Sequence, residues 1–112
     1  MTEQALRVWR EIGDRHGEGS TWNNLADTYR ALGQFEPACH GYRMALRVHR
    51  VTGNRGGEAW AHDGLGRALR NAGQPDAARR SWRRALAILD DTGDPRSDEI
   101  RALLAENGGV LR

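Results

Sequence analysis

The chain has 112 residues, of which 38% are apolar and 29% charged, and this composition is typical of one folded domain. Seventeen basic and 15 acidic side chains give a formal net charge of +2, too small a surplus for a strongly basic or acidic protein. No apolar run approaches the roughly 20 residues of a membrane span, and the single cysteine, Cys39, excludes an internal disulfide framework and a zinc module.

Six helices are predicted along the chain, and no segment shows the alternation of a strand. The first covers residues 3–12, and the next two cover 18–32 and 36–51. In the helix 18–32 the apolar and small side chains recur at helical spacing: Trp22, Leu25, Ala26 and Tyr29. Gly33 ends this helix, because glycine adopts a positive φ at little cost.

The remaining helices are predicted over residues 58–72, 76–91 and 97–106. Pro75 suits the entry to the helix 76–91, because the first turn loses no intrahelical donor to proline. In the last helix, Asp98 and Glu99 place negative charge in the first turn, where it favours the helix dipole.

The sequence repeats itself at an offset of 40 residues. Thirteen of the 40 positions of residues 13–52 recur without a gap in residues 53–92. Each unit holds a first helix, A, and a second helix, B. A half repeat at 1–12 and a capping helix and tail at 93–112 complete the order B–AB–AB–A. A helix pair cannot bury its apolar face alone, so we expect a single all-α domain, a solenoid of antiparallel helices with a shared core.

Nine positions of the first full repeat resemble the tetratricopeptide repeat, or TPR. They are Trp22, Leu25, Ala26, Tyr29, Gly33, Phe35, Ala38, Tyr42 and Ala45. The second repeat is similar and departs at His62, Leu69 and Pro75. The period exceeds the usual length of about 34 residues and resembles a long-spacer subtype with Gly-Asp-Arg-x-Gly-Glu between repeats. The resemblance implies a module that binds a protein or peptide in a concave groove lined by the first helices.

A narrower resemblance concerns residues 85–105, which are similar to the C-terminal end of TPR regions in actinobacterial SARP-type and NB-ARC-type regulators. It implies that the chain is a fragment of a cytoplasmic bacterial signalling or transcription regulator. The DNA-binding and ATPase domains of such regulators are absent from these 112 residues, so their activities are not carried over.

Groove positions carried over from the family give a set of candidate partner-binding residues with mixed charge. They are Ser20, Asn23, Asn24, Asp27 and Arg30 in the first repeat and Trp60, Asp63, Gly64, Arg67 and Arg70 in the second. The carboxylate clamp of chaperone-binding members needs Lys and Asn at several of these places. Only Asn23 matches, so chaperone tails are not the expected partner.

Trp60 is the strongest single candidate, because it aligns with Ser20 and not with a core position. An exposed tryptophan there predicts a binding hot spot. The alternative is that its ring packs on a neighbouring first helix. Trp9, Trp22 and Trp82 lie on apolar stripes and are predicted to belong to the core.

Two further surfaces are candidates for binding. Val8, Trp9 and Ile12 would be uncovered at the open end of the stack, which makes homodimerisation the alternative function. Four arginines surround Trp82 on one helix: Arg79, Arg80, Arg83 and Arg84. These arginines could bind phosphate groups. However, nearby aspartates offset their charge, and each half of the chain has a net charge of only +1. Nucleic acid is therefore not the expected partner.

The sequence predicts no enzyme, no metal site and no cofactor. The four histidines show no HExxH spacing. Cys39 and His40 are adjacent on a helix and therefore point about 100° apart, a poor geometry for a nucleophile and its base. The segment 53–57 is rich in glycine but lacks the Gly-Lys-Ser/Thr ending of a phosphate loop, and it is predicted to be a repeat linker.

Overall fold

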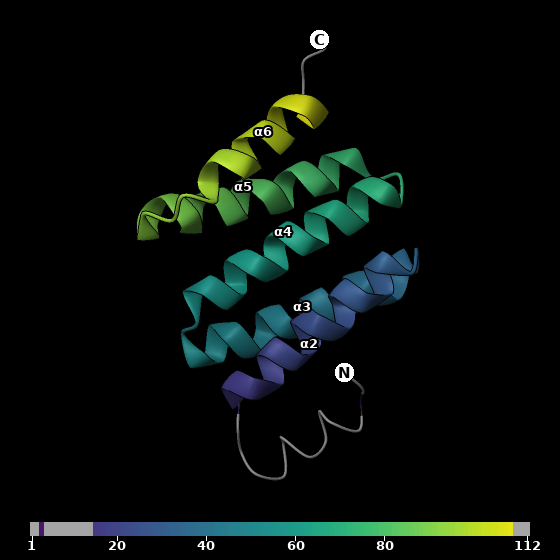
Figure 1. Ribbon diagram of the computed structural model, residues 1–112, viewed down its shortest axis with the longest axis vertical. Coiled ribbons are helices and arrows are strands. Elements are labelled where there is room, and N and C mark those ends of the chain that lie inside the picture. Colours follow the sequence, from purple (N-terminus) through teal and green to yellow (C-terminus); the bar gives the residue numbers. More distant parts are fainter. Residues whose placement is uncertain (1–2, 4–14, 109–112) are drawn as a thin grey trace.

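Five α-helices make up the part of the chain that the computed structural model describes, Glu3 and residues 15–108. With the labels of Figure 1, they are α2 (Arg15–Ala31), α3 (Phe35–Thr52), α4 (Arg55–Asn71), α5 (Pro75–Thr92) and α6 (Ser97–Gly108). The predicted all-α architecture is confirmed, with no strand among the described residues. Of the predicted helix 3–12, all but Glu3 lies outside them.

Successive helices are separated by turns that each contain a glycine with positive φ. These glycines recur every twenty residues: Gly33, Gly53, Gly73 and Gly93, with φ of 78°, 71°, 82° and 72°. Any other L-residue would be strained in this conformation. The Gly53 backbone N–H donates to the Arg50 carbonyl, and the Asn54 N–H donates to the His49 carbonyl. These two hydrogen bonds cap the C-terminal end of α3.

Helices α2 and α4 both begin three residues earlier than predicted. The cause at α4 is Asn54, whose side-chain oxygen accepts a hydrogen bond from the Gly57 N–H at 2.8 Å and so caps the helix. The prediction that residues 53–57 form a linker was therefore wrong for most of the segment, because residues 55–57 are the first turn of α4.

The helices follow one another along the long axis of the molecule, from α2 to α6 (Figure 1). Each helix packs on the next, and α2 also contacts α4. An ion pair of 3.0 Å between Arg67 and Glu99 ties α4 to α6. The A helices α2 and α4 therefore lie side by side, and the B helices α3 and α5 pack against them.

The shared core contains the predicted apolar stripes, and its largest members are aromatic. Trp82 and Tyr42 are fully buried and Trp22 is buried, which confirms Trp22 and Trp82 as core residues; Trp9 lies outside the described residues. The Tyr42 ring lies where a Cβ at Gly64 would stand, and the Trp82 indole does the same at Gly66. The small residues of α4 thus let the large rings of both B helices approach its backbone.

In the part of the chain that the structure describes, none of the helices has a stretch long and apolar enough to cross a membrane.

Candidate protein-interaction site

The predicted groove residues lie mostly on one exposed surface of α2 and α4, which we call the first-helix face. Its half-buried members are Ser20, Asp27, Arg30, Trp60, Asp63, Arg67 and Arg70, and Asn24 is exposed. A hydrogen bond between Trp60 and Asp27 joins the two repeats on this face, and the ion pairs Asp27–Arg30 and Asp63–Arg67 lie within one repeat each. Two predicted members, Asn23 and Gly64, are buried.

Asn23 corrects the predicted set, because its side chain has no exposed surface. Its amide nitrogen lies 3.1 Å from the His49 Nε2 and 3.4 Å from the Gly57 carbonyl oxygen, so it links α2 to α3 and α4. The His49 ring fills the space that Gly19 and Gly57 leave open. Asn23 therefore supports the first-helix face from below and cannot touch a partner. Gly64, likewise, is covered by the Tyr42 ring.

Asp27 organises the half of the face that belongs to the first repeat. Its carboxylate accepts hydrogen bonds from the Tyr42 hydroxyl and, at 3.0 Å, from the Trp60 Nε1. The Tyr42 oxygen also accepts a bond of 3.1 Å from the Arg30 Nε. Trp60 is thus tied by this hydrogen bond to the neighbouring A helix. Its role as a hot spot stays a prediction.

The Tyr42 hydroxyl keeps its proton in this arrangement. Burial raises the pKa of Tyr42, and the hydrogen bond to Asp27 raises it further. The phenol therefore remains a hydrogen-bond donor to Asp27 over the whole physiological pH range.

Asp63 organises the second half of the face. Its Oδ1 accepts bonds from the Arg67 Nε at 2.9 Å and from the Trp82 Nε1 at 3.3 Å. Arg67 also reaches Glu99 on α6. Asp63 is the repeat equivalent of Asn23, and Arg67 is the equivalent of Asp27. Each repeat therefore builds a polar cluster around one aspartate. Within the repeat, the position of Asp63 lies one helical turn before that of Asp27.

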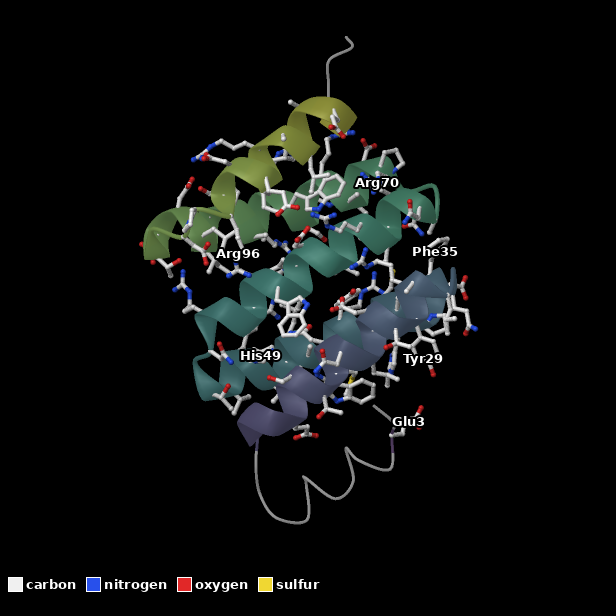
Figure 2. The ribbon with its side chains drawn as sticks, viewed as in Figure 1. Glu3, Tyr29, Phe35, His49, Arg70 and Arg96 are labelled. Carbon is white, nitrogen blue, oxygen red and sulfur yellow. The ribbon has the colours of Figure 1, made fainter. Side chains whose placement is uncertain are left out.

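Arg70 differs from the other arginines of this face. Its guanidinium carbon lies 5.6 Å from the centroid of the Trp82 ring, within the range of a cation–π contact. It forms no ion pair with any residue that the structure describes. By contrast, Arg30, which occupies the position of Arg70 in the first repeat, pairs with an aspartate, and so does Arg67. Figure 2 shows Arg70 at the end of the helices opposite to His49. Arg70 is a positioned cation whose hydrogen-bonding capacity is still available.

His62, at the family's tryptophan position, is a buried structural histidine with 3% of its surface exposed. Burial, together with the positive charges of Arg50 and Arg84, lowers its pKa to about 4. It is therefore neutral at pH 7. No group of three or more His, Cys, Asp or Glu side chains that could hold a metal ion occurs among the described residues.

A pocket of about 340 Å³ opens away from the predicted residues, between the start of α3 and the turn after α4. Its lining residues are Phe35, Glu36, Cys39, Arg43, Leu69, Ala72 and Gln74. Burial raises the pKa of the Cys39 thiol, which therefore stays protonated and weakly nucleophilic. The sequence carries no signal for this pocket, because it forms where two consecutive repeats meet.

A stack of helix pairs with an exposed polar face is the architecture of a helical repeat protein. Residues 18–91, well over half of the chain, match the family model described as Tetratricopeptide repeat. The chain therefore belongs to the tetratricopeptide repeat family, as its sequence predicted. Repeats of this family are non-catalytic and generally mediate protein–protein interaction. None of the curated proteins compared with the chain matched it.

Proposed function

We propose that this chain is a protein-interaction module that binds an extended segment of a partner protein across the first-helix face. Arg70 carries the proposal. A guanidinium stacked on Trp82, without a carboxylate among the described residues, suits a carboxylate or carbonyl oxygen of a bound peptide. Trp60, ten residues earlier on α4 and therefore about 15 Å away along the helix axis, supplies a half-buried aromatic surface of the kind enriched in binding hot spots.

The preorganisation of the face supports the same function. Asp27, Trp60 and Arg67 are already held by hydrogen bonds to groups of the chain itself. Binding therefore costs little side-chain entropy, because the rotamers are set before the partner arrives. Asp27 pairs with Arg30, and Asp63 and Glu99 both pair with Arg67. None of these carboxylates pairs with Arg70, which is left to bind an anionic or strongly polar group.

Peptide selection tests this function even though the natural partner is not identified. Random peptides displayed on phage are selected on the full chain, and the best one is titrated by isothermal calorimetry. We expect its affinity to fall by about tenfold or more in Arg70→Gln. Arg96→Gln, an exposed arginine that already pairs with Asp94, is the control and should leave affinity unchanged. Equal affinities of both variants and the original chain would reject the first-helix face as the site.

The proposed context is a bacterial signalling or transcription regulator in the cytoplasm, in which the module acts by shape and charge complementarity without covalent chemistry. This context rests on the resemblance of residues 85–105 to the TPR regions of such regulators. Nucleic acid is not part of the proposal.

Self-association is the alternative function. It rests on the apolar stripe of Val8, Trp9 and Ile12, which lies outside the described residues. Size-exclusion chromatography with light scattering distinguishes the two. A mass near 12.5 kDa favours peptide binding by a monomer, whereas twice that mass, returning to the monomer value in Trp9→Ala, favours dimerisation.

A further inference from the structure

The exposed sides of the two B helices carry a set of arginines, which we call the arginine band. Its members are Arg43 and Arg47 on α3 and Arg80, Arg83 and Arg84 on α5, all exposed. Arg43 and Arg83 are equivalent in the 40-residue repeat, so they stand on the same face of successive repeats. Helices α3 and α5 both pack on α4, which lies between them in the sequence.

The members of the band differ from most other arginines in having no ion pair among the described residues. Elsewhere an acidic partner is the rule: Arg30, Arg50, Arg55, Arg67, Arg79, Arg96 and Arg101 each pair with a carboxylate. In the band, the closest polar contact of Arg47 is the sulfur of Met44, at 3.9 Å. Five arginines are therefore free to bind an anionic partner.

Acidic side chains flank the band at both ends of α5 and at the start of α3. Glu36 and Asp76 stand in the first turns of α3 and α5, and Asp90 and Asp91 stand near the end of α5. Along each helix the band extends for about one turn, or roughly 6 Å, at 1.5 Å per residue. A long polyanion such as duplex DNA would run past the band and meet these carboxylates, whereas a short anionic segment would not.

The band also lacks the aromatic surfaces that bind single-stranded nucleic acid. Tyr42 and Trp82 are fully buried, and Phe35 lies at the start of α3, beyond the band. Bases therefore find no stacking platform here. An extended polypeptide fits the spacing, because side chains on one face of a strand recur about every 6.6 Å, close to one turn of the underlying helix.

We propose that the arginine band binds a short acidic polypeptide segment, whose Asp or Glu carboxylates pair with the guanidinium groups of α3 and α5. This surface is on the B helices, and the proposal does not depend on peptide binding by the first-helix face.

Fluorescence polarisation with a labelled hexaglutamate peptide and the full chain tests the proposal. We expect binding that weakens with salt and that falls by about tenfold or more in the double variant Arg43→Gln/Arg83→Gln. Both residues are exposed, so the fold should be retained, and circular dichroism checks this. Arg96→Gln is the control, because this exposed arginine already pairs with Asp94, and the variant should bind hexaglutamate like the original chain.

A DNA duplex of about one helical turn is the competing probe. Tighter binding of the duplex than of hexaglutamate would overturn the proposal in favour of nucleic acid. The proposal is equally overturned if hexaglutamate does not bind, or if the double variant binds it as well as the original chain does.

Discussion

Trp60 combines a position that the repeat predicts with a hydrogen bond that it does not. Its position outside the core pattern could be predicted from the repeat, because it aligns with Ser20. Its hydrogen bond to Asp27 could not, because that contact depends on how α2 and α4 lie relative to each other. The same bond makes Trp60 both a part of the first-helix face and a link between repeats.

Loss of this bond should have a measurable cost. In Trp60→Phe an aromatic ring remains but the N–H donor is lost. We expect the free energy of unfolding to fall by about 1 kcal/mol. The loss is no larger because Asp27 is partly exposed to water. Urea denaturation measures it. In an Asp27→Ala background the same substitution should cost almost nothing through this bond; an equal cost in both backgrounds would show that the bond does not contribute.

His62 should make stability depend on pH. Its pKa is about 4 in the folded chain and about 6.5 when unfolded, so the unfolded state binds more protons between these values. The stabilisation is complete above pH 6.5 and is lost as pH falls toward 4. We expect a loss of about 2 kcal/mol between pH 8 and pH 5, measured by urea denaturation at each pH.

His62→Leu is the control for this effect, because leucine does not titrate. Its unfolding free energy should change less between pH 8 and pH 5 than that of the original chain. If both chains lose the same stability, the titration of another group is responsible and the assignment to His62 is wrong.

Helix α4 shows how far periodicity predicts an element. The alternation of helices and glycine turns predicted its existence and its C-terminal end within one residue. Its start was predicted three residues late, because Gly56 and Gly57 looked like linker residues. Gly57 is instead required by tertiary packing, since the His49 ring from α3 lies where its Cβ would stand. A pattern within one helix cannot reveal a ring contributed by another.

Two glycines of α4 should respond in opposite ways to alanine. Gly64→Ala would drive a methyl group into the Tyr42 ring, and we expect a loss of about 2 kcal/mol. Gly56→Ala meets only the Asn54 Oδ1, at 3.7 Å, and should stabilise the helix by up to about 1 kcal/mol. Thermal unfolding followed by circular dichroism compares the two. A stabilised Gly64→Ala would mean that Tyr42 does not pack as described.

At the scale of the whole molecule, the 40-residue period was sufficient to predict the solenoid, because apolar stripes and turn glycines recur at equivalent places. The polar surface was predicted less completely, because equivalent positions differ in chemistry: Asp27 corresponds to Arg67, and Asn23 to Asp63. Asn23 is buried, and Arg70 is distinguished by its stacking on Trp82 and by the lack of an ion pair with any described residue. These differences arise from contacts between helices, which the repeat alone does not encode.

The central claim is that a partner segment binds across α2 and α4. It is tested most directly by the NMR signal of the Trp60 indole N–H during titration with a selected peptide. We predict that this signal and the backbone amides around Arg70 shift with a common dissociation constant, while those around Arg47 do not. Shifts confined to α3 and α5, with the Trp60 signal unmoved, would contradict the claim.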